Sequence, residues 1–102
     1  MDSTHKWNNY LYCWDNAKDA INQKKHGIEF IEAMTVFDDD NALYKPDPDH
    51  SIDEDRFIII GYSKDDNLLV VCHCYREGDT VIRIFSAREA NNKERRDYGG
   101  RL

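Results

Sequence analysis

The chain has 102 residues and a formal net charge of −6 at pH 7. Its composition, 40% hydrophobic and 33% charged, is typical of a soluble globular protein with one modest core. No apolar run approaches the roughly 20 residues that a membrane-spanning helix needs. The N-terminus also lacks the apolar segment of a secretory signal. These features argue against a membrane protein and favour one cytoplasmic domain over residues 1–102.

Charge is distributed unevenly along the chain. Between Asp38 and Asp55 there are eight acidic residues and one basic residue, Lys45. Residues 76–102 contain seven basic and five acidic residues. The negative net charge argues weakly against nucleic-acid binding, whereas the C-terminal third is the basic end of the chain.

The cysteines Cys13, Cys72 and Cys74 are too few, and odd in number, for a disulfide framework. Cys72 and Cys74 share one face of a predicted strand, so both are expected to be reduced in the core. A metal site at Cys72-His73-Cys74 would need a second pair of ligands at suitable spacing, and the sequence shows none. We therefore expect neither a metal nor a cofactor.

The N-terminal part predicts a strand followed by a helix. Residues 10–14 are aromatic and bounded by asparagines, which is typical of a strand. Asp15 is placed to cap a helix over residues 16–27, and Gly27 is placed to end it. Lys24, Lys25 and His26 suit the negative end of the helix dipole. One helical face carries a stripe that consists of Ala17, Ala20, Ile21 and the methylenes of Lys24.

A second helix is predicted over residues 29–37, because its apolar residues recur at the spacing of a core-facing stripe. The stripe consists of Phe30, Ala33, Met34 and Phe37. Residues 38–41 end this helix, and residues 42–44 form a candidate short strand. Residues 45–55 contain both prolines of the chain and are expected to form a loop.

Three strong strands follow, over residues 56–63, 67–75 and 80–86. Short turns between them predict an antiparallel meander. The chain then closes with a helix over residues 86–100, because Ser86 and Glu89 have the spacing of a capping box.

This order of elements predicts an α+β fold. We expect a short N-terminal strand, two N-terminal helices, an antiparallel sheet of three to four strands and a C-terminal helix. Residues alternate between the two faces of each strand. The more apolar face, which carries Cys72 and Ile84, is expected to lie under the two N-terminal helices. The other face is expected to stay partly open.

Two ionisable residues, His73 and Arg83, interrupt the apolar strands. Both are expected on the open face, but their convergence depends on the hairpin register. A two-residue turn at Gly78-Asp79 pairs Cys74 with Arg83, whereas an added bulge residue pairs His73 with Arg83. The sequence leaves both registers open. A converged pair would form an anion site able to move a proton, and the alternative is a solvated pair satisfied by carboxylates.

The other cationic residues also have simple structural explanations. Dipole compensation accounts for Lys25 and His26, and a solvated loop position accounts for His50. His50 and Arg56 can nevertheless reach the rim of the same open face. The basic run 93–96 is more typical of a solvated helix face than of a nucleic-acid contact.

Several phrases of this sequence resemble the BrnT toxins of bacterial type II toxin–antitoxin systems. They are KHG at 25–27, DPDHS at 47–51, RF.IIG at 56–61, H.YREGD..IRI.SAR at 73–88 and ERR.Y at 94–98. They occur in that order at the spacing of the family, and the resemblance extends from about Tyr12 to Tyr98.

The resemblance implies a RelE-like ribonuclease fold. It also implies cleavage of RNA without a metal ion, and thereby inhibition of translation. The expected substrate is RNA, free or on the ribosome. The expected partner is a BrnA-like antitoxin, a ribbon-helix-helix protein through which the complex would bind operator DNA.

The resemblance also carries over site residues. A base or acid and several cations are what metal-free RNA cleavage requires, because the 2′-hydroxyl loses a proton and the phosphorane gains charge. The expected catalytic residues are His73, Arg83, Arg56 and Arg88. The expected RNA contacts are Lys25, His26, His50 and Arg76.

Two features depart from the family pattern. Glu29 stands where the family commonly has a serine or threonine helix cap. The net charge of −6 is low for an enzyme that cleaves RNA, because neutralising phosphates supplies much of the affinity. Cleavage on the ribosome or a local basic patch would reconcile this charge with RNA binding. The alternative function is a non-catalytic interaction module, which binds a ribbon-helix-helix protein and tunes operator repression.

Overall fold

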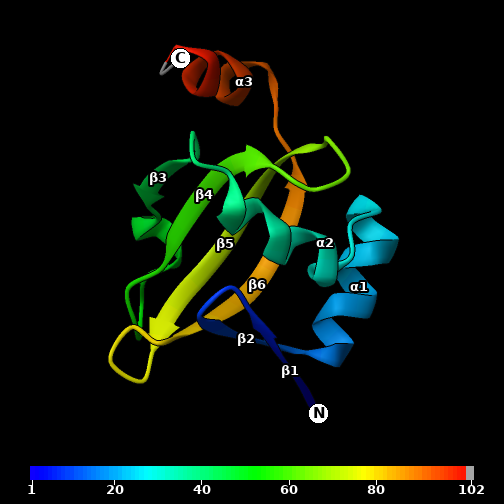
Figure 1. Ribbon diagram of the computed structural model, residues 1–102, viewed down its shortest axis with the longest axis vertical. Coiled ribbons are helices and arrows are strands. Elements are labelled where there is room, and N and C mark those ends of the chain that lie inside the picture. The colour runs from blue at the N-terminus through cyan, green and yellow to red at the C-terminus, as the bar shows by residue number, and fades with distance from the viewer. Residues whose placement is uncertain (101–102) are drawn as a thin grey trace.

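The computed structural model describes residues 1–100 as a six-stranded sheet with helices at its edge, on one face and at one end (Figure 1). The strand order is β1-β2-β6-β5-β4-β3. The expected α+β class is confirmed, and the sheet is larger than the three to four strands predicted. The strands are β1 (Asp2–Trp7), β2 (Tyr10–Asp15), β3 (Leu43–Pro46), β4 (Phe57–Tyr62), β5 (Leu68–Arg76) and β6 (Val81–Glu89).

The central strands pair as the sequence predicts. β4, β5 and β6 form an antiparallel meander, and β3 joins it beside β4. β2 lies on the other side of β6 and runs parallel to it, with Leu11 opposite Val81 and Cys13 opposite Arg83. The predicted meander is therefore confirmed. The parallel pairing of β2 with β6 was not predicted, because short hairpin turns indicate only antiparallel neighbours.

β1 is a strand that the sequence analysis missed. It forms a hairpin with β2 through Asn8 and Asn9, whose φ angles are 46° and 71°. Asparagine tolerates this left-handed conformation, which two-residue hairpin turns require. The strand itself is mostly polar, because it forms an edge of the sheet.

Helix α1 (Asn16–His26) begins and ends as predicted. The Asp15 side chain accepts hydrogen bonds from the backbone N–H groups of Ala17 and Lys18, and Gly27 ends the helix at φ 72°. The predicted stripe, however, does not face the core: its four residues are exposed, and Ile21 is 62% exposed.

The buried residue of α1 is Asn22. Its amide donates to the carbonyl oxygens of Ile28 and Ala87 and accepts from the N–H of Ala87. α1 thereby lies beside β6, past the point where the pairing of β2 with β6 ends at Arg83. Polar capping of a strand edge, and not apolar packing, positions this helix.

Helix α2 (Phe30–Thr35) continues into the 3-10 turn η1 (Val36–Asp38). It buries Phe30, Ala33 and Met34, which confirms the predicted stripe. These side chains pack on a core formed by the sheet residues Ile59, Leu69, Val71, Ile82, Ile84 and Ala87.

The helix-covered face is therefore the face of β5 that carries Leu69, Val71 and His73. The prediction that the helices cover Cys72 is wrong, although Ile84 does lie beneath them. Cys72 is half-buried and faces the open side of the sheet. Both faces of β5 are apolar enough that alternation alone did not distinguish them.

The C-terminal region also departs from expectation. β6 continues to Glu89, and the last helix, α3, spans Asn92–Gly99. Its capping box consists of Asn91 and Glu94, so the predicted box at Ser86 and Glu89 is wrong. α3 lies at one end of the sheet, as Figure 1 shows, and buries Tyr98 against β4 and β5. No helix among residues 1–100 is long and apolar enough to cross a membrane.

Candidate active site

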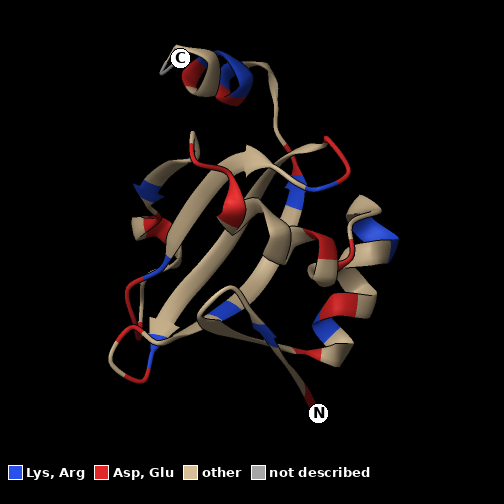
Figure 2. Cartoon of the chain, viewed as in Figure 1, with Lys and Arg blue, Asp and Glu red and all other residues tan. Residues whose placement is uncertain are grey.

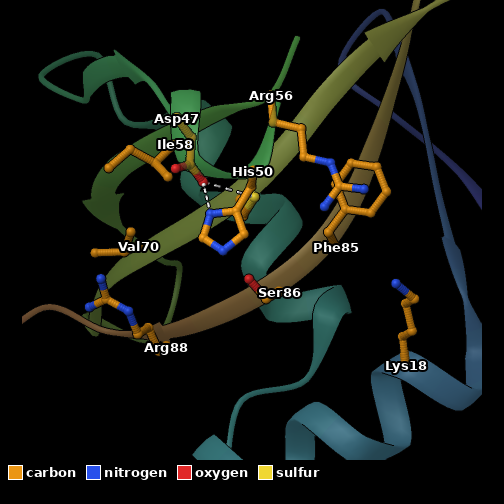
Figure 3. A pocket seen from close by; sticks show the side chains of 10 residues that line it. Lys18, Asp47, His50, Arg56, Ile58, Val70, Phe85, Ser86 and Arg88 are labelled. Atoms are coloured by element: carbon orange, nitrogen blue, oxygen red, sulfur yellow. Dashed lines mark hydrogen bonds and ion pairs between the residues drawn. The ribbon is translucent and has the colours of Figure 1, made fainter. Parts of the chain in front are cut away.

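A cavity of about 330 Å³ opens on the face of the sheet that α2 does not cover. β4, β5 and β6 form its floor, and α1 and the 3-10 turn η2 (Pro48–His50) form its rim (Figure 3). Several of its residues are cationic. It is lined by Lys18, Asp47, His50, Arg56, Ile58, Val70, Cys72, Phe85, Ser86 and Arg88.

A β-bulge in β6 shapes the floor. Cys72 pairs with Ser86, and the next residue of β5, His73, pairs with Ile84, so Phe85 is the extra residue. A bulge re-aims the side chains around it. Phe85 and Ser86 consequently both line the cavity although they are adjacent in the chain.

His50 and Asp47 form a dyad at the rim. His50 Nδ1 lies 3.0 Å from Asp47 Oδ2, and the His50 side chain is 65% exposed. Figure 3 shows the second ring nitrogen pointing away from Asp47, toward the middle of the cavity. A solvent-accessible imidazole oriented by a carboxylate is placed to accept or donate a proton.

Cys72 is the second neighbour of Asp47. Its Sγ lies 3.6 Å from Asp47 Oδ2. Burial, followed by the charge of Asp47, raises the pKa of Cys72 to about 11. The group is therefore a neutral thiol at physiological pH and does not act as a nucleophile in the cavity.

Arg56 and Lys18 approach the ring of Phe85. The Arg56 guanidinium lies 3.8 Å from the ring centroid, and Lys18 Nζ lies 5.7 Å from it. Among residues 1–100, neither side chain forms an ion pair with a carboxylate. Phe85 thus holds two cations at the cavity without neutralising them.

Arg88 is held differently. Its guanidinium donates two hydrogen bonds, of 2.7 and 2.8 Å, to the Glu94 carboxylate. This pairing raises the pKa of Arg88 and lowers the pKa of Glu94. Because Glu94 is also the capping-box residue of α3, the C-terminal helix fixes Arg88 at the cavity wall.

A second cavity, of about 190 Å³, continues the first along α1. The two share Lys18, Phe85 and Ser86, and the second adds Lys25 and His26. The open face therefore carries a continuous basic groove. The structure brings five predicted residues to this groove: Lys25, His26, His50, Arg56 and Arg88.

His73 lies elsewhere, in the core under η1. It is 0% exposed, and its ring contacts Phe37, Phe57 and Tyr75. Nδ1 donates to the carbonyl oxygen of Val71 at 3.1 Å, and Nε2 has no hydrogen-bond partner among residues 1–100. Burial lowers the pKa of His73 to about 4. The imidazole is therefore neutral at physiological pH.

Arg83 projects from the opposite face of the sheet to His73. It pairs with Cys74, as the two-residue-turn alternative requires, and donates to the Asp2 carboxylate at 3.0 and 3.2 Å. The prediction that His73 and Arg83 converge on one open face is therefore wrong. The mechanism proposed below therefore assigns no catalytic role to His73 or Arg83. Arg76 lies away from the groove too, paired with Glu54 at 2.8 Å.

Among the cavity residues that were not predicted as site residues, three form its dyad and its cation contacts: Asp47, Lys18 and Phe85. A signal for Asp47 exists, because DPDH places a carboxylate three residues before His50, within one 3-10 turn. Lys18 and Phe85 have no comparable local signal, since a helix packing and a bulge bring them together. Within residues 1–100, no group of three or more His, Cys, Asp or Glu side chains is arranged to hold a metal ion.

Comparisons with known proteins bear on this arrangement. The family described as "Ribonuclease toxin, BrnT, of type II toxin-antitoxin system" matches residues 14–94. The chain belongs to the BrnT family. Its fold resembles the 1.1 Å crystal structure of the Brucella abortus ribonuclease toxin BrnT, with a TM-score of 0.58 and 23% identity over 78% of this chain and 94% of that one. No curated protein matches the chain in sequence.

Proposed function

We propose that this BrnT family member is a metal-independent endoribonuclease that cleaves RNA in the open-face cavity and thereby inhibits translation. The observation that carries the proposal is the cavity itself. It places the His50–Asp47 dyad opposite Arg56, Lys18 and Arg88 on one accessible surface. Family membership supports the ribonuclease activity.

The chemistry follows from the types of residue present. His50 takes the proton of the RNA 2′-hydroxyl, or returns one to the leaving oxygen, while Asp47 orients its ring. The cations stabilise the extra charge of the phosphorane that forms when the 2′-oxygen attacks the adjacent phosphate. Arg56 and Lys18 suit this task best, because no carboxylate of residues 1–100 neutralises them.

The local charge accounts for RNA binding by a chain of negative net charge. Figure 2 shows basic segments on α1 and β6, which border the groove, and acidic segments along several loops. RNA affinity depends on the phosphates that the groove contacts and not on the total charge.

The partner is proposed from the family. A type II toxin–antitoxin family implies an antitoxin. We propose a BrnA-like ribbon-helix-helix protein that covers the toxin and recruits the complex to operator DNA. We also propose that the fold of this chain is related to that of the RelE-like ribonucleases. Co-expression with such a protein is expected to relieve toxicity, and the two proteins are expected to co-elute from a sizing column at micromolar concentration.

Cleavage of single-stranded RNA by the purified chain in EDTA tests the activity. The products are expected to carry a 2′,3′-cyclic phosphate and a 5′-hydroxyl, because the 2′-hydroxyl is the nucleophile. Lys18→Ala is expected to weaken RNA binding, and Lys24→Ala, on the same exposed helix but outside the cavity, is the matched control. Cleavage that requires an added divalent ion contradicts the metal-free mechanism.

Growth arrest separates this proposal from a non-catalytic interaction module. Expression of the wild-type chain is expected to stop growth. A His50→Ala/Arg56→Ala variant is expected to permit growth while still binding the antitoxin. If that variant arrests growth as strongly as the wild type, the toxicity does not arise from the cavity.

A further inference from the structure

A second groove lies on the helix-covered face, beyond η1. Two cavities of about 580 and 220 Å³ meet there, and both are lined by Tyr10 and Tyr75. Tyr44 borders the smaller cavity, and Phe57 borders the larger one. Tyr10 and Tyr44 are 43% and 51% exposed, so both rings are accessible to a ligand in these cavities.

The charged residues of this groove are all acidic. Asp38 lines the smaller cavity, and Glu54, Asp55 and Asp79 line the larger one. Arg76 neutralises Glu54, and Trp7 donates to Asp38, whereas Asp55 and Asp79 form no ion pair among residues 1–100. The polarity is therefore opposite to that of the basic groove on the other face.

Burial and the acidic surroundings raise the pKa of a tyrosine in this groove. Burial, followed by the charges of Tyr44, Tyr10 and Asp79, raises the pKa of Tyr75 to about 12. The faces of aromatic rings attract cations through their quadrupole, and nearby carboxylates add to that attraction. Each cavity thus combines aromatic rings with at least one carboxylate.

His73 lies behind the inner wall of this groove. His73 packs directly against Phe37, Phe57 and Tyr75, the side chains that form the inner wall of the groove. Its Nδ1–H is already donated to Val71, so Nε2 is an acceptor, and it is buried without a partner among residues 1–100. His73 lines neither cavity, so it is a reporter of changes in the wall and not a contact of the ligand.

We propose that this groove, the acidic tyrosine groove, binds an extended polypeptide segment of a partner protein that carries arginine side chains at alternate positions. Alternate side chains of an extended segment point to the same side, so two of them can enter the two cavities together. Carboxylates repel the phosphates of nucleic acids and anionic lipids, which leaves a cationic peptide as the complementary ligand. The proposal goes beyond the ribonuclease function and does not depend on it.

The probe for this groove is a labelled peptide, acetyl-Gly-Arg-Gly-Arg-Gly-Arg-Gly-amide, titrated with the full chain by fluorescence anisotropy. Its control is the same peptide with citrulline in place of arginine, which keeps the shape and removes the charge. The arginine peptide is expected to bind at least about tenfold more tightly. Ring nitrogen NMR is expected to show a shift of His73 Nε2 on binding.

Charge-matched variants localise the binding. Asp55→Asn/Asp79→Asn is expected to weaken the arginine peptide at least about tenfold. Asp65→Asn/Glu89→Gln removes the same charge outside both cavities and is expected to leave the affinity within about twofold. Equal weakening by both pairs overturns the proposal, because it shows non-specific attraction to an acidic protein. Concentration-dependent dimerisation that the arginine peptide reverses assigns the groove to a second copy of this chain instead.

An RNA cleavage assay on the same protein tests the ribonuclease proposal independently of the peptide-binding proposal. The two grooves lie on opposite faces, so saturating arginine peptide is expected to leave the cleavage rate unchanged. Peptide binding without any cleavage defeats the ribonuclease proposal alone, and cleavage without peptide binding defeats the groove proposal alone.

Discussion

Cys72 and His73 are adjacent on β5, yet they belong to two chemically different regions. Cys72 faces a cationic cavity that is open to solvent, next to Asp47. His73 faces an aromatic core and is 0% exposed. One peptide bond therefore separates the floor of the proposed active site from a fully buried histidine of the core.

The two histidines His50 and His73 make the same contrast for one residue type. His50 is 65% exposed in its side chain and has a carboxylate at 3.0 Å. His73 is surrounded by aromatic rings, and its pKa falls to about 4 because burial disfavours its charged form. Access to water and to a counter-charge decides which imidazole can exchange protons.

The largest expected effect is on catalysis by His50. His50→Ala is expected to lower the rate of RNA cleavage about 100- to 10,000-fold, because it removes the general base or acid. His73→Phe is expected to retain most of the activity, since it keeps an aromatic ring in the core. Single-turnover cleavage measures both rates, and circular dichroism verifies folding. An inactive, folded His73→Phe protein with an active His50→Ala protein would reverse the assignment.

The next effect separates two arginines on the open side of the sheet. Arg56→Ala is expected to slow cleavage about 100- to 1000-fold, because Arg56 is an unneutralised cation in the cavity. Arg83→Ala is expected to change the rate by no more than about threefold, because Asp2 already neutralises Arg83 away from the cavity. Cleavage assays at matched RNA concentration compare the two. Equal losses would place Arg83 in the mechanism.

The pH dependence of stability tests the buried state of His73. Its pKa is about 4 in the folded chain and near 6.5 when unfolded, so the unfolded state binds the proton more readily between these values. The free energy of unfolding is expected to fall by about 1.4 kcal/mol per pH unit as the pH drops from 6.5 toward 4. His73→Phe is expected to abolish this slope.

Urea titrations across this pH range measure that slope. The paired carboxylates Asp39 and Glu94 contribute in a different window, because their lowered pKa values make stability fall only as they protonate at lower pH. A wild-type slope that His73→Phe leaves unchanged between pH 6.5 and 5 contradicts the burial of a neutral His73.

The smallest expected effect concerns Asp47. Asp47→Asn keeps the shape of the dyad but removes the charge beside an exposed imidazole, so the cleavage rate is expected to fall only about two- to fivefold. The same change is expected to lower the pKa of Cys72, because the charge of Asp47 raises it. Alkylation of Cys72 as a function of pH measures that change, and an unaltered thiol pKa means that burial alone sets it.

Local patterns predicted much of this fold. Asp15 and Gly27 mark the ends of α1 because helix caps depend on neighbouring residues only. The spacing of Phe30, Ala33 and Met34 predicted a buried helix, and the apolar runs of β4, β5 and β6 predicted the antiparallel meander. Where both faces of a strand are apolar, as in β5, the sequence carried no signal for which face the helices cover.

The candidate site likewise combines features that the sequence predicted with features that only long-range packing set. The sequence by itself determined which residues of the groove are cationic and, through its family resemblance, that His50, Arg56 and Arg88 belong to a site. Only the tertiary structure decided that Phe85 turns outward at a bulge, that Lys18 reaches it from α1, and that His73 turns into the core. These outcomes depend on long-range packing: a one-residue shift in strand pairing exchanges the two faces of a strand, and no pattern of neighbouring residues records that shift.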